Sequence, residues 1–138
     1  MTTKLITSEE DLERYAATLL PLISAMRMIG LRGDLGAGKT TFVRGLLRAM
    51  DYTVNVKSPT YGLFETYDFA DLSVAHFDLY RLSDPDELEF IGFADFIAAD
   101  MLCLIEWPEK GGKWTANMDL EIQFDFADRG RKVSYRKF

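Results

Sequence analysis

The residues best suited to chemistry lie in one short segment, Gly33 to Thr40, which reads GDLGAGKT. The segment fits G-x-x-x-x-G-K-S/T, the pattern of a loop that binds the phosphates of a nucleotide. Such a loop must curl so that its backbone N–H groups point inward, and glycine allows both the curl and the close approach of a phosphate. Lys39 can then reach the β- and γ-phosphates, and the Thr40 hydroxyl can coordinate Mg²⁺. The segment therefore predicts a nucleotide-binding site.

A loop of this kind works with an acidic residue at the end of a neighbouring strand, which holds the metal directly or through water. Two candidates are present: Glu106 closes the apolar run MLCLIE, and Asp78 lies near the end of VAHFDLY. Ligands of α/β sheets bind at the carboxyl ends of the strands, where both acids are expected. The alternative is that each acid only marks where a strand reaches solvent. His76 shares a strand face with Asp78, and we interpret it as a packed structural histidine rather than a base.

Hydrophobic periodicity predicts the helices that must position these residues. An earlier helix is predicted from about Ser8 to Leu20, ending near Pro21, because Thr7 and Glu10 have the spacing of a capping box. A second helix should follow the glycine loop directly, because apolar residues recur there at helical intervals. Its apolar face consists of Phe42, Val43, Leu46, Leu47 and Met50.

The segment DPDELEFIGFADFI predicts a third helix, which begins near Pro85 and has Asp84 as its cap. Six acidic residues occur from Asp84 to Asp100, and no basic residue lies among them. This segment therefore predicts a solvated, negatively charged surface.

Strands are predicted from continuous or alternating apolar runs. Residues 26–33, MRMIGLRG, predict a buried strand, and residues 101–107 have the continuous apolar character of a strand buried on both faces of a sheet. Residues 61–69 and 73–80 predict an antiparallel hairpin, and the alternating tail predicts two strands about a turn at 128–130. This order of elements predicts an α/β fold with a mixed, P-loop NTPase-like β-sheet flanked by helices, with antiparallel strands in the middle and at the C-terminus.

Composition limits the possible classes of protein. The 138 residues, 48% of them apolar, suit one domain that spans residues 1–138. A net charge of −6 provides no basic surface for nucleic acid. A single cysteine, Cys103, excludes a disulfide framework and a cysteine-rich zinc site, and we expect a buried, inert thiol. No signal peptide or run of roughly 18 apolar residues is present, so a cytoplasmic protein without membrane contact is predicted.

Five segments, in their order and spacing, resemble the bacterial TsaE family (formerly YjeE) of small P-loop ATPases. They are GDLGAGKTTF, NVKSPTY, HFDLYRL, DPDELEFIGF and IEWPE. Only the first is shared with many other proteins, and the other four together are specific. The resemblance is close over residues 30–109 and loose at both ends. It implies an ATPase required to form N6-threonylcarbamoyladenosine at position 37 of tRNAs that read codons beginning with A.

The resemblance also implies partners and cofactors. In this family the ATPase binds a heterodimer of TsaB and TsaD, of which TsaD carries the transferase site. Hydrolysis of ATP is thought to reset that assembly between turnovers. ATP and Mg²⁺ are the implied cofactors, and tRNA is contacted only through the partners, which agrees with the net charge of −6.

Residue by residue, the resemblance implies that Lys39, Asp78 and Glu106 are catalytic, with Asp78 close to the γ-phosphate and the attacking water. Thr40 and Glu106 are implied to hold Mg²⁺. Trp107, directly after the acid, is expected to support the site or the partner surface, with packing at the strand end as the alternative. The residues implied to bind the phosphates are Gly33, Asp34, Leu35, Gly36, Ala37, Gly38, Lys39, Thr40 and Thr41.

Weaker features concern the rest of the nucleotide. The segment SPT, residues 58–60, resembles a switch, although such a sequence is also an ordinary turn. The adenine is expected near Glu9 and near the C-terminal turn at Gly130.

Two other functions use the same loop. The first is a small P-loop kinase that passes the γ-phosphoryl group to a metabolite. The absence of an arginine-rich lid after the predicted helices counts against it. The second is a nucleotide-binding adaptor without significant turnover.

Overall fold

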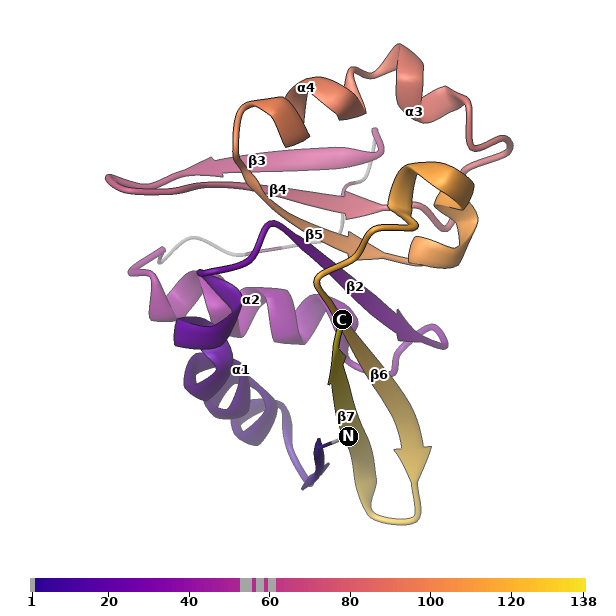
Figure 1. The fold of residues 1–138 in the computed structure, drawn as a ribbon. Helices are drawn as coiled ribbons and strands as arrows, with labels where there is room; N and C mark the ends of the chain where they lie inside the picture. Colours follow the sequence, from indigo (N-terminus) through magenta and orange to yellow (C-terminus); the bar gives the residue numbers. More distant parts are fainter. Residues whose placement is uncertain (1, 53–55, 57–58, 60–61) are drawn as a thin grey trace.

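The computed structural model describes residues 2–138 apart from 53–55, 57–58 and 60–61. Within these residues, the strands form one seven-stranded sheet (Figure 1). Its order is β1 (Thr2–Ile6), β7 (Gly130–Lys137), β6 (Leu120–Ala127), β2 (Met28–Gly33), β5 (Leu102–Glu106), β4 (Ser73–Asp78) and β3 (Phe64–Asp68). Strand β2 is parallel to both β5 and β6, and β4 is parallel to β5, whereas the outer pairs are antiparallel. The predicted α/β class with a mixed sheet is confirmed.

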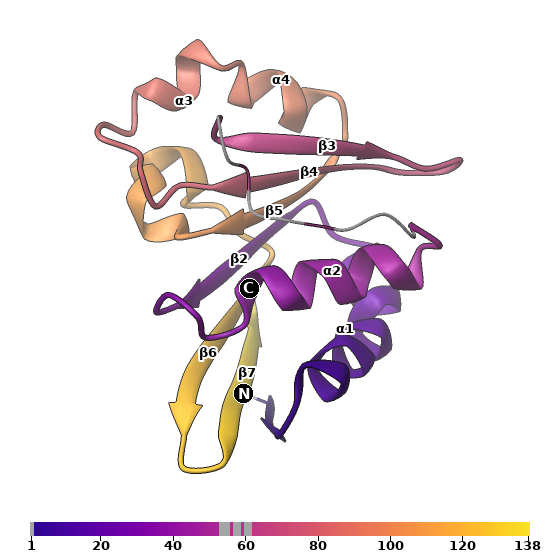
Figure 2. The ribbon, with the colours of Figure 1, turned by 180° about the vertical axis from the view of Figure 1, so that it is seen from behind.

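Helices cover both faces of this sheet (Figures 1 and 2). Helices α1 (Glu9–Ile23) and α2 (Lys39–Ala49) pack on one face, and α3 (Glu87–Phe90) and α4 (Phe93–Ala98) pack on the other. A 3₁₀ segment, η1 (Pro108–Thr115), follows β5. Successive side chains of β5 point to opposite faces of the sheet. Leu104 belongs to the core beneath α2, and Ile105 belongs to the core beneath α3 and α4. Glu106 continues the alternation toward α2.

Helix α1 differs from its prediction at both ends. Its N-cap is Ser8, whose hydroxyl accepts a hydrogen bond from the Asp11 N–H at 3.1 Å, so the cap lies one residue beyond Thr7. The predicted end near Pro21 is wrong, because the helix continues to Ile23. Proline removes one backbone hydrogen bond in the last turns, but burial of the Ile23 side chain in the main core favours continuation.

The third predicted helix is two short helices. They are separated by Gly92, whose φ of +79° interrupts helical geometry. The predicted Asp84 cap is confirmed for the turn that begins at Pro85, because the Asp84 carboxylate accepts a hydrogen bond from the Asp86 N–H at 2.9 Å. Asp86, the residue directly before α3, makes no side-chain cap. Instead, the Glu87 carboxylate reaches back and accepts hydrogen bonds from the N–H groups of Ser83 at 2.8 Å and Asp84 at 3.1 Å.

Both predicted antiparallel pairs are confirmed, with β3 beside β4 and β6 beside β7. Strand β1 was not predicted. Its side chains are exposed except for Ile6, so the sequence carries no alternation to mark it. The strand forms because its backbone pairs with β7.

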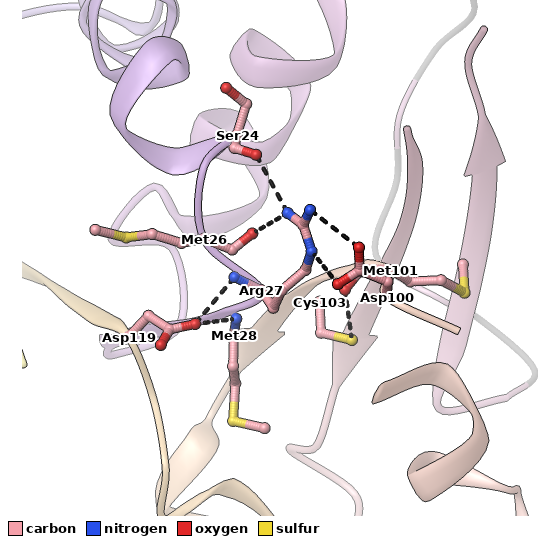
Figure 3. Close-up of polar contacts among 8 residues, drawn as sticks. All are labelled: Ser24, Met26, Arg27, Met28, Asp100, Met101, Cys103 and Asp119. Atoms are coloured by element: carbon pink, nitrogen blue, oxygen red, sulfur yellow. Dashed lines mark hydrogen bonds and ion pairs between the residues drawn. The ribbon is translucent and has the colours of Figure 1, made fainter. Parts of the chain in front are cut away.

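One of the acids predicted to face solvent has a basic partner (Figure 3). Asp100 accepts from Arg27 at 2.6 Å, at the end of the sheet opposite the glycine loop. The Asp119 carboxylate accepts from the backbone N–H groups of Arg27 at 2.9 Å and Met28 at 3.0 Å. These bonds join the starts of β2, β5 and β6. Nearby Cys103 is buried, and burial raises the pKa of its thiol to about 12, as expected for an inert residue.

Candidate functional site

The glycine loop connects β2 to α2 at the carboxyl edge of the central strands. Gly36 and Gly38 have φ values of +79° and +116°, which side-chain-bearing residues rarely adopt. A Cβ atom on Gly38 would also lie 2.7 Å from a methyl group of Leu12 in α1. Conformation and packing therefore both require glycine at this position, as the phosphate-binding pattern predicts.

Lys39 is the first residue of α2, and its side chain is only 4% exposed. The ammonium donates to the backbone carbonyls of Gly33 and, at 3.1 Å, of Asp34. It also lies 4.5 Å from the centroid of the Trp107 ring. Burial lowers the pKa of Lys39, and the negative charge of Glu106 opposes that shift. The ammonium thus lies beside the loop, positioned to receive a negatively charged group.

Glu106 ends β5 between β2 and β4, and its side chain is buried. One carboxylate oxygen, Oε2, accepts a hydrogen bond from the Thr40 hydroxyl at 3.0 Å. His76 Nε2 lies 2.5 Å from the same oxygen. The predicted metal ligands Thr40 and Glu106 are therefore in direct contact.

Asp78 lies opposite Glu106 in the register of β4 and β5. Its carboxylate accepts a hydrogen bond from the Tyr80 N–H at 3.0 Å. Burial raises the pKa of Asp78 above its ordinary value, and the Tyr80 bond acts in the opposite direction. The nearby Glu106 carboxylate raises the pKa further. A half-buried second acid with a shifted pKa in a cleft is a common feature of functional sites.

A cavity of about 270 Å³ brings the predicted residues together. It is bounded by the glycine loop, the start of α2 and the ends of β4 and β5. Its lining consists of Glu9, Leu35, Gly36, Gly38, Lys39, Thr40, Thr41, Asp78, Glu106 and Trp107. Of the other predicted loop residues, Gly33 and Asp34 contribute the carbonyls that bind Lys39, and Ala37 is buried in the core.

A second cavity, of about 240 Å³, shares Glu9, Gly36, Gly38 and Thr41 with the first. Gly130 lies in its wall with a φ of +119°, and a Cβ atom there would lie 2.0 Å from the Ile6 carbonyl oxygen. The two residues predicted to lie near a base, Glu9 and Gly130, thus line one cavity beside the phosphate-binding loop.

Sequence reasoning missed Arg131, which also lines the second cavity. Its guanidinium donates to the Gly36 carbonyl at 3.2 Å and lies 4.4 Å from the centroid of the Phe126 ring. The only sequence signal was its place after the turn glycine, and the contact with the loop depends on tertiary structure. Of the predicted switch, Ser58 and Thr60 lie outside the described residues.

The donor atoms in the first cavity suit Mg²⁺, which prefers oxygen ligands. In the described part of the chain, no group of three or more His, Cys, Asp and Glu side chains could hold a metal alone. The Thr40 hydroxyl and the carboxylates of Glu106 and Asp78 are oxygen donors in one cavity. This set fits an ion that takes its remaining ligands from phosphate and water.

Comparison with known proteins places the chain in context. A family model described as "Threonylcarbamoyl adenosine biosynthesis protein TsaE" matches residues 6–133. Three similar proteins carry the name "tRNA threonylcarbamoyladenosine biosynthesis protein TsaE". The one from Haemophilus influenzae is 47% identical over 88% of this chain and 77% of its own length. Those from Rickettsia felis and Aquifex aeolicus are 35% and 36% identical, over 94% and 96% of this chain and 75% and 95% of their own lengths.

The fold also has a counterpart among solved structures. The crystal structure of Bacillus subtilis YdiB superposes with a TM-score of 0.78 at 24% identity. The match covers 99% of this chain and 84% of the other, so both share one fold. None of the helices in the described part of this chain has the length and apolar character needed to cross a bilayer.

Proposed function

The chain belongs to the TsaE family of threonylcarbamoyl adenosine biosynthesis proteins, and on that premise we propose that it is a P-loop ATPase. It acts in the formation of N6-threonylcarbamoyladenosine at position 37 of tRNAs that read codons beginning with A. It hydrolyses ATP, with Mg²⁺, in a complex with TsaB and TsaD.

The observation that carries this proposal is the convergence of Lys39, Thr40, Asp78 and Glu106 on one cavity. A glycine-rich loop, a lysine, a hydroxyl and two acids are the set of groups that phosphoryl transfer from a nucleotide requires. The neighbouring cavity offers space for the base next to the same loop.

The chain's own groups act mainly through charge and position. The loop N–H groups and the start of α2 attract the phosphates, because the N-terminus of a helix carries partial positive charge. Lys39 exchanges its contacts with the loop carbonyls for the transferring phosphate oxygens, where its charge favours the transition state. Asp78, next to this position, orients the attacking water.

Thr40 and Glu106 would hold the Mg²⁺ of a bound nucleotide, and the ion would supply positive charge beside the phosphates. The Thr40 hydroxyl donates to Glu106 and retains lone pairs that could accept a further partner. Glu106 thus stabilises the site by accepting from Thr40 and by supplying negative charge.

The acidic net charge supports an indirect relation to tRNA. A chain with net charge −6 is repelled by phosphate backbones, so we assign tRNA binding to TsaB and TsaD. These partners can also supply a group in trans, such as an arginine that stabilises the transition state.

The test is release of inorganic phosphate from ATP by the purified chain, alone and with the TsaB–TsaD pair. We expect slow release alone and a different rate with the partners, and loss of release in the Lys39→Ala variant. Equal rates with and without partners would contradict the role in the complex. Phosphate transfer to a metabolite would indicate a kinase, and binding of ATP without turnover would indicate an adaptor.

A further inference from the structure

His76 is a buried titratable residue that the steps above do not use. Its side chain is 0% exposed, in β4, two residues before Asp78 and on the same strand face. Its neighbour on that face, Val74, is an ordinary core residue. A polar ring is costly to bury unless a hydrogen bond compensates it. The contact of Nε2 with Glu106 Oε2, at 2.5 Å, is that compensation.

The surroundings of the two ring nitrogens identify the hydrogen-bond donor. An ionised carboxylate only accepts, so the hydrogen of this contact belongs to Nε2. The other nitrogen, Nδ1, is buried and has no hydrogen-bond partner among the described residues. A hydrogen on Nδ1 instead of Nε2 would leave a buried donor unpaired and break the contact with Glu106. Nε2 therefore carries the hydrogen of this contact.

Glu106 Oε2 accepts from two directions, from His76 and from the Thr40 hydroxyl. The two donors come from separate elements, β4 and the start of α2. Two donors on one oxygen hold that oxygen in place, and neither occupies the second oxygen, Oε1. The carboxylate therefore has one oxygen fixed by the protein and one that these donors leave available.

The register of the sheet places His76 away from the phosphates. In the parallel pair of β4 and β5, His76 lies opposite Leu104, and Asp78 lies opposite Glu106. His76 thus lies two residues farther than the two acids from the carboxyl ends of their strands. It does not line the cavity beside the glycine loop. The hydrogen bond to Glu106 connects His76 to that cavity.

We propose that His76 is a positioning residue that holds the Glu106 carboxylate in the orientation that binds a divalent cation. The inference rests on the proposed nucleotide and metal site, and it deepens that proposal. A glutamate side chain has three rotatable bonds and loses this freedom when it binds a metal. The His76 hydrogen bond removes much of that freedom beforehand. Residues that orient metal ligands in this way typically change metal affinity by about 10–100-fold when mutated.

The test uses Mn²⁺ as the metal probe and ADP as the nucleotide. Binding of Mn²⁺ to the protein in saturating ADP is measured from the electron paramagnetic resonance signal of the free ion. Binding of ADP without metal is measured by calorimetry in EDTA, and folding is measured by thermal unfolding. Neither binding measurement depends on catalytic turnover.

Two variants form a matched pair, His76→Gln and His76→Asn. The amide nitrogen of glutamine can occupy the place of Nε2, whereas that of asparagine falls short of Glu106 by one carbon. We expect Mn²⁺ affinity to fall about 10–100-fold in the asparagine variant and to stay within about threefold of the parent in the glutamine variant. Binding of ADP in EDTA should be unchanged in both. His76→Leu, which removes the donor, should resemble the asparagine variant if it folds.

A double-mutant cycle separates positioning from general packing. In a Glu106→Gln background, His76→Asn should cause little further loss of Mn²⁺ affinity, because the ligand it orients is already altered. Additive losses would show that His76 acts on the fold and not through Glu106, and would overturn the inference.

Equal Mn²⁺ affinities in the parent and the asparagine variant would also overturn the inference. Equal losses in the asparagine and glutamine variants would do the same, because the position of the donor would then be irrelevant. In both cases a parent protein that binds ADP and Mn²⁺ leaves the proposed function intact. A parent that binds neither would overturn the proposed function together with this inference.

Discussion

Asp78 and Glu106 lie directly opposite each other on the parallel strands β4 and β5, and both side chains line the cavity beside the phosphate-binding loop. Their surroundings differ. Glu106 accepts from the Thr40 hydroxyl, whereas Asp78 accepts from a backbone N–H just beyond its own strand. The pair therefore suits two roles, one toward the metal and one toward the attacking water.

Exchange of each acid for its amide should separate these roles. Glu106→Gln should raise the Mg²⁺ concentration needed for half-maximal hydrolysis by about tenfold or more, because a charged oxygen ligand is lost. Asp78→Asn should leave nucleotide affinity nearly unchanged and lower hydrolysis, because its effect is confined to the transition state. Titrations with Mg²⁺ and with a fluorescent ATP analogue decide between them. If only Asp78→Asn needed a higher Mg²⁺ concentration, the two roles would have to be exchanged.

Lys39→Ala should abolish most ATP turnover and leave the fold intact. The ammonium provides charge to the transferring phosphates, and its present contacts are hydrogen bonds to loop carbonyls and the face of the Trp107 ring. Phosphate release in the complex with TsaB and TsaD measures the first effect, and circular dichroism measures the second. Unchanged turnover in a folded variant would refute the role of the loop.

Asp78→Asn should also change the pH dependence of stability. Burial raises the folded-state pKa of Asp78, so folding disfavours its ionised form. The resulting destabilisation is absent below the unfolded-state pKa, near the ordinary value of 3.8, and complete above the folded-state pKa. The asparagine variant should therefore have a higher Tm than the parent near pH 7, and this difference should shrink as the pH falls through that window. A Tm difference between the variant and the parent that stays constant at all pH values would contradict the raised pKa of Asp78.

Gly130→Ala should destabilise the protein by about 1–3 kcal/mol, because its backbone conformation is strained for any other residue and its Cβ atom would meet the Ile6 carbonyl. The affinity for ATP should also fall, because Gly130 and Ile6 line the cavity assigned to the base. Gly62→Ala is the matched control: it has open space around it, and we expect a change within about 0.5 kcal/mol. Urea unfolding and nucleotide titration test both. Similar stability of the two variants would contradict the packing argument.

The central part of the fold could be predicted because its signals are local. The apolar runs of β2 and β5, the glycine loop and the amphipathic α2 each follow from neighbouring residues, and these elements carry Lys39, Thr40 and Glu106. The helix of residues 84–97 was predicted as one piece because apolar spacing continues across Gly92. The positive φ of Gly92, which interrupts the helix after α3, depends on how the two short helices pack against the sheet.

The rest depends on contacts between distant residues. Strand β1 has an exposed surface and exists through pairing with β7, so no local pattern marks it. Arg131 reaches the Gly36 carbonyl only because β7 brings it to the loop. The sequence likewise indicated that His76 is packed, but its contact with Glu106 requires the register of β4 and β5.

The pairing of the first strand with the last also constrains the order of biosynthesis. Residues 2–6 cannot join the sheet until residues 130–137 have left the ribosome, because β7 is their only partner strand in the described structure (Figure 1). The parallel strands β2, β5 and β4 pair with one another and do not need residues 130–137 for that pairing. The wall of the second cavity, made by Ile6 and Gly130, forms last. A chain that lacked residues 130–137 would therefore lack both the pairing of its first strand and one wall of the cavity that we assign to the base.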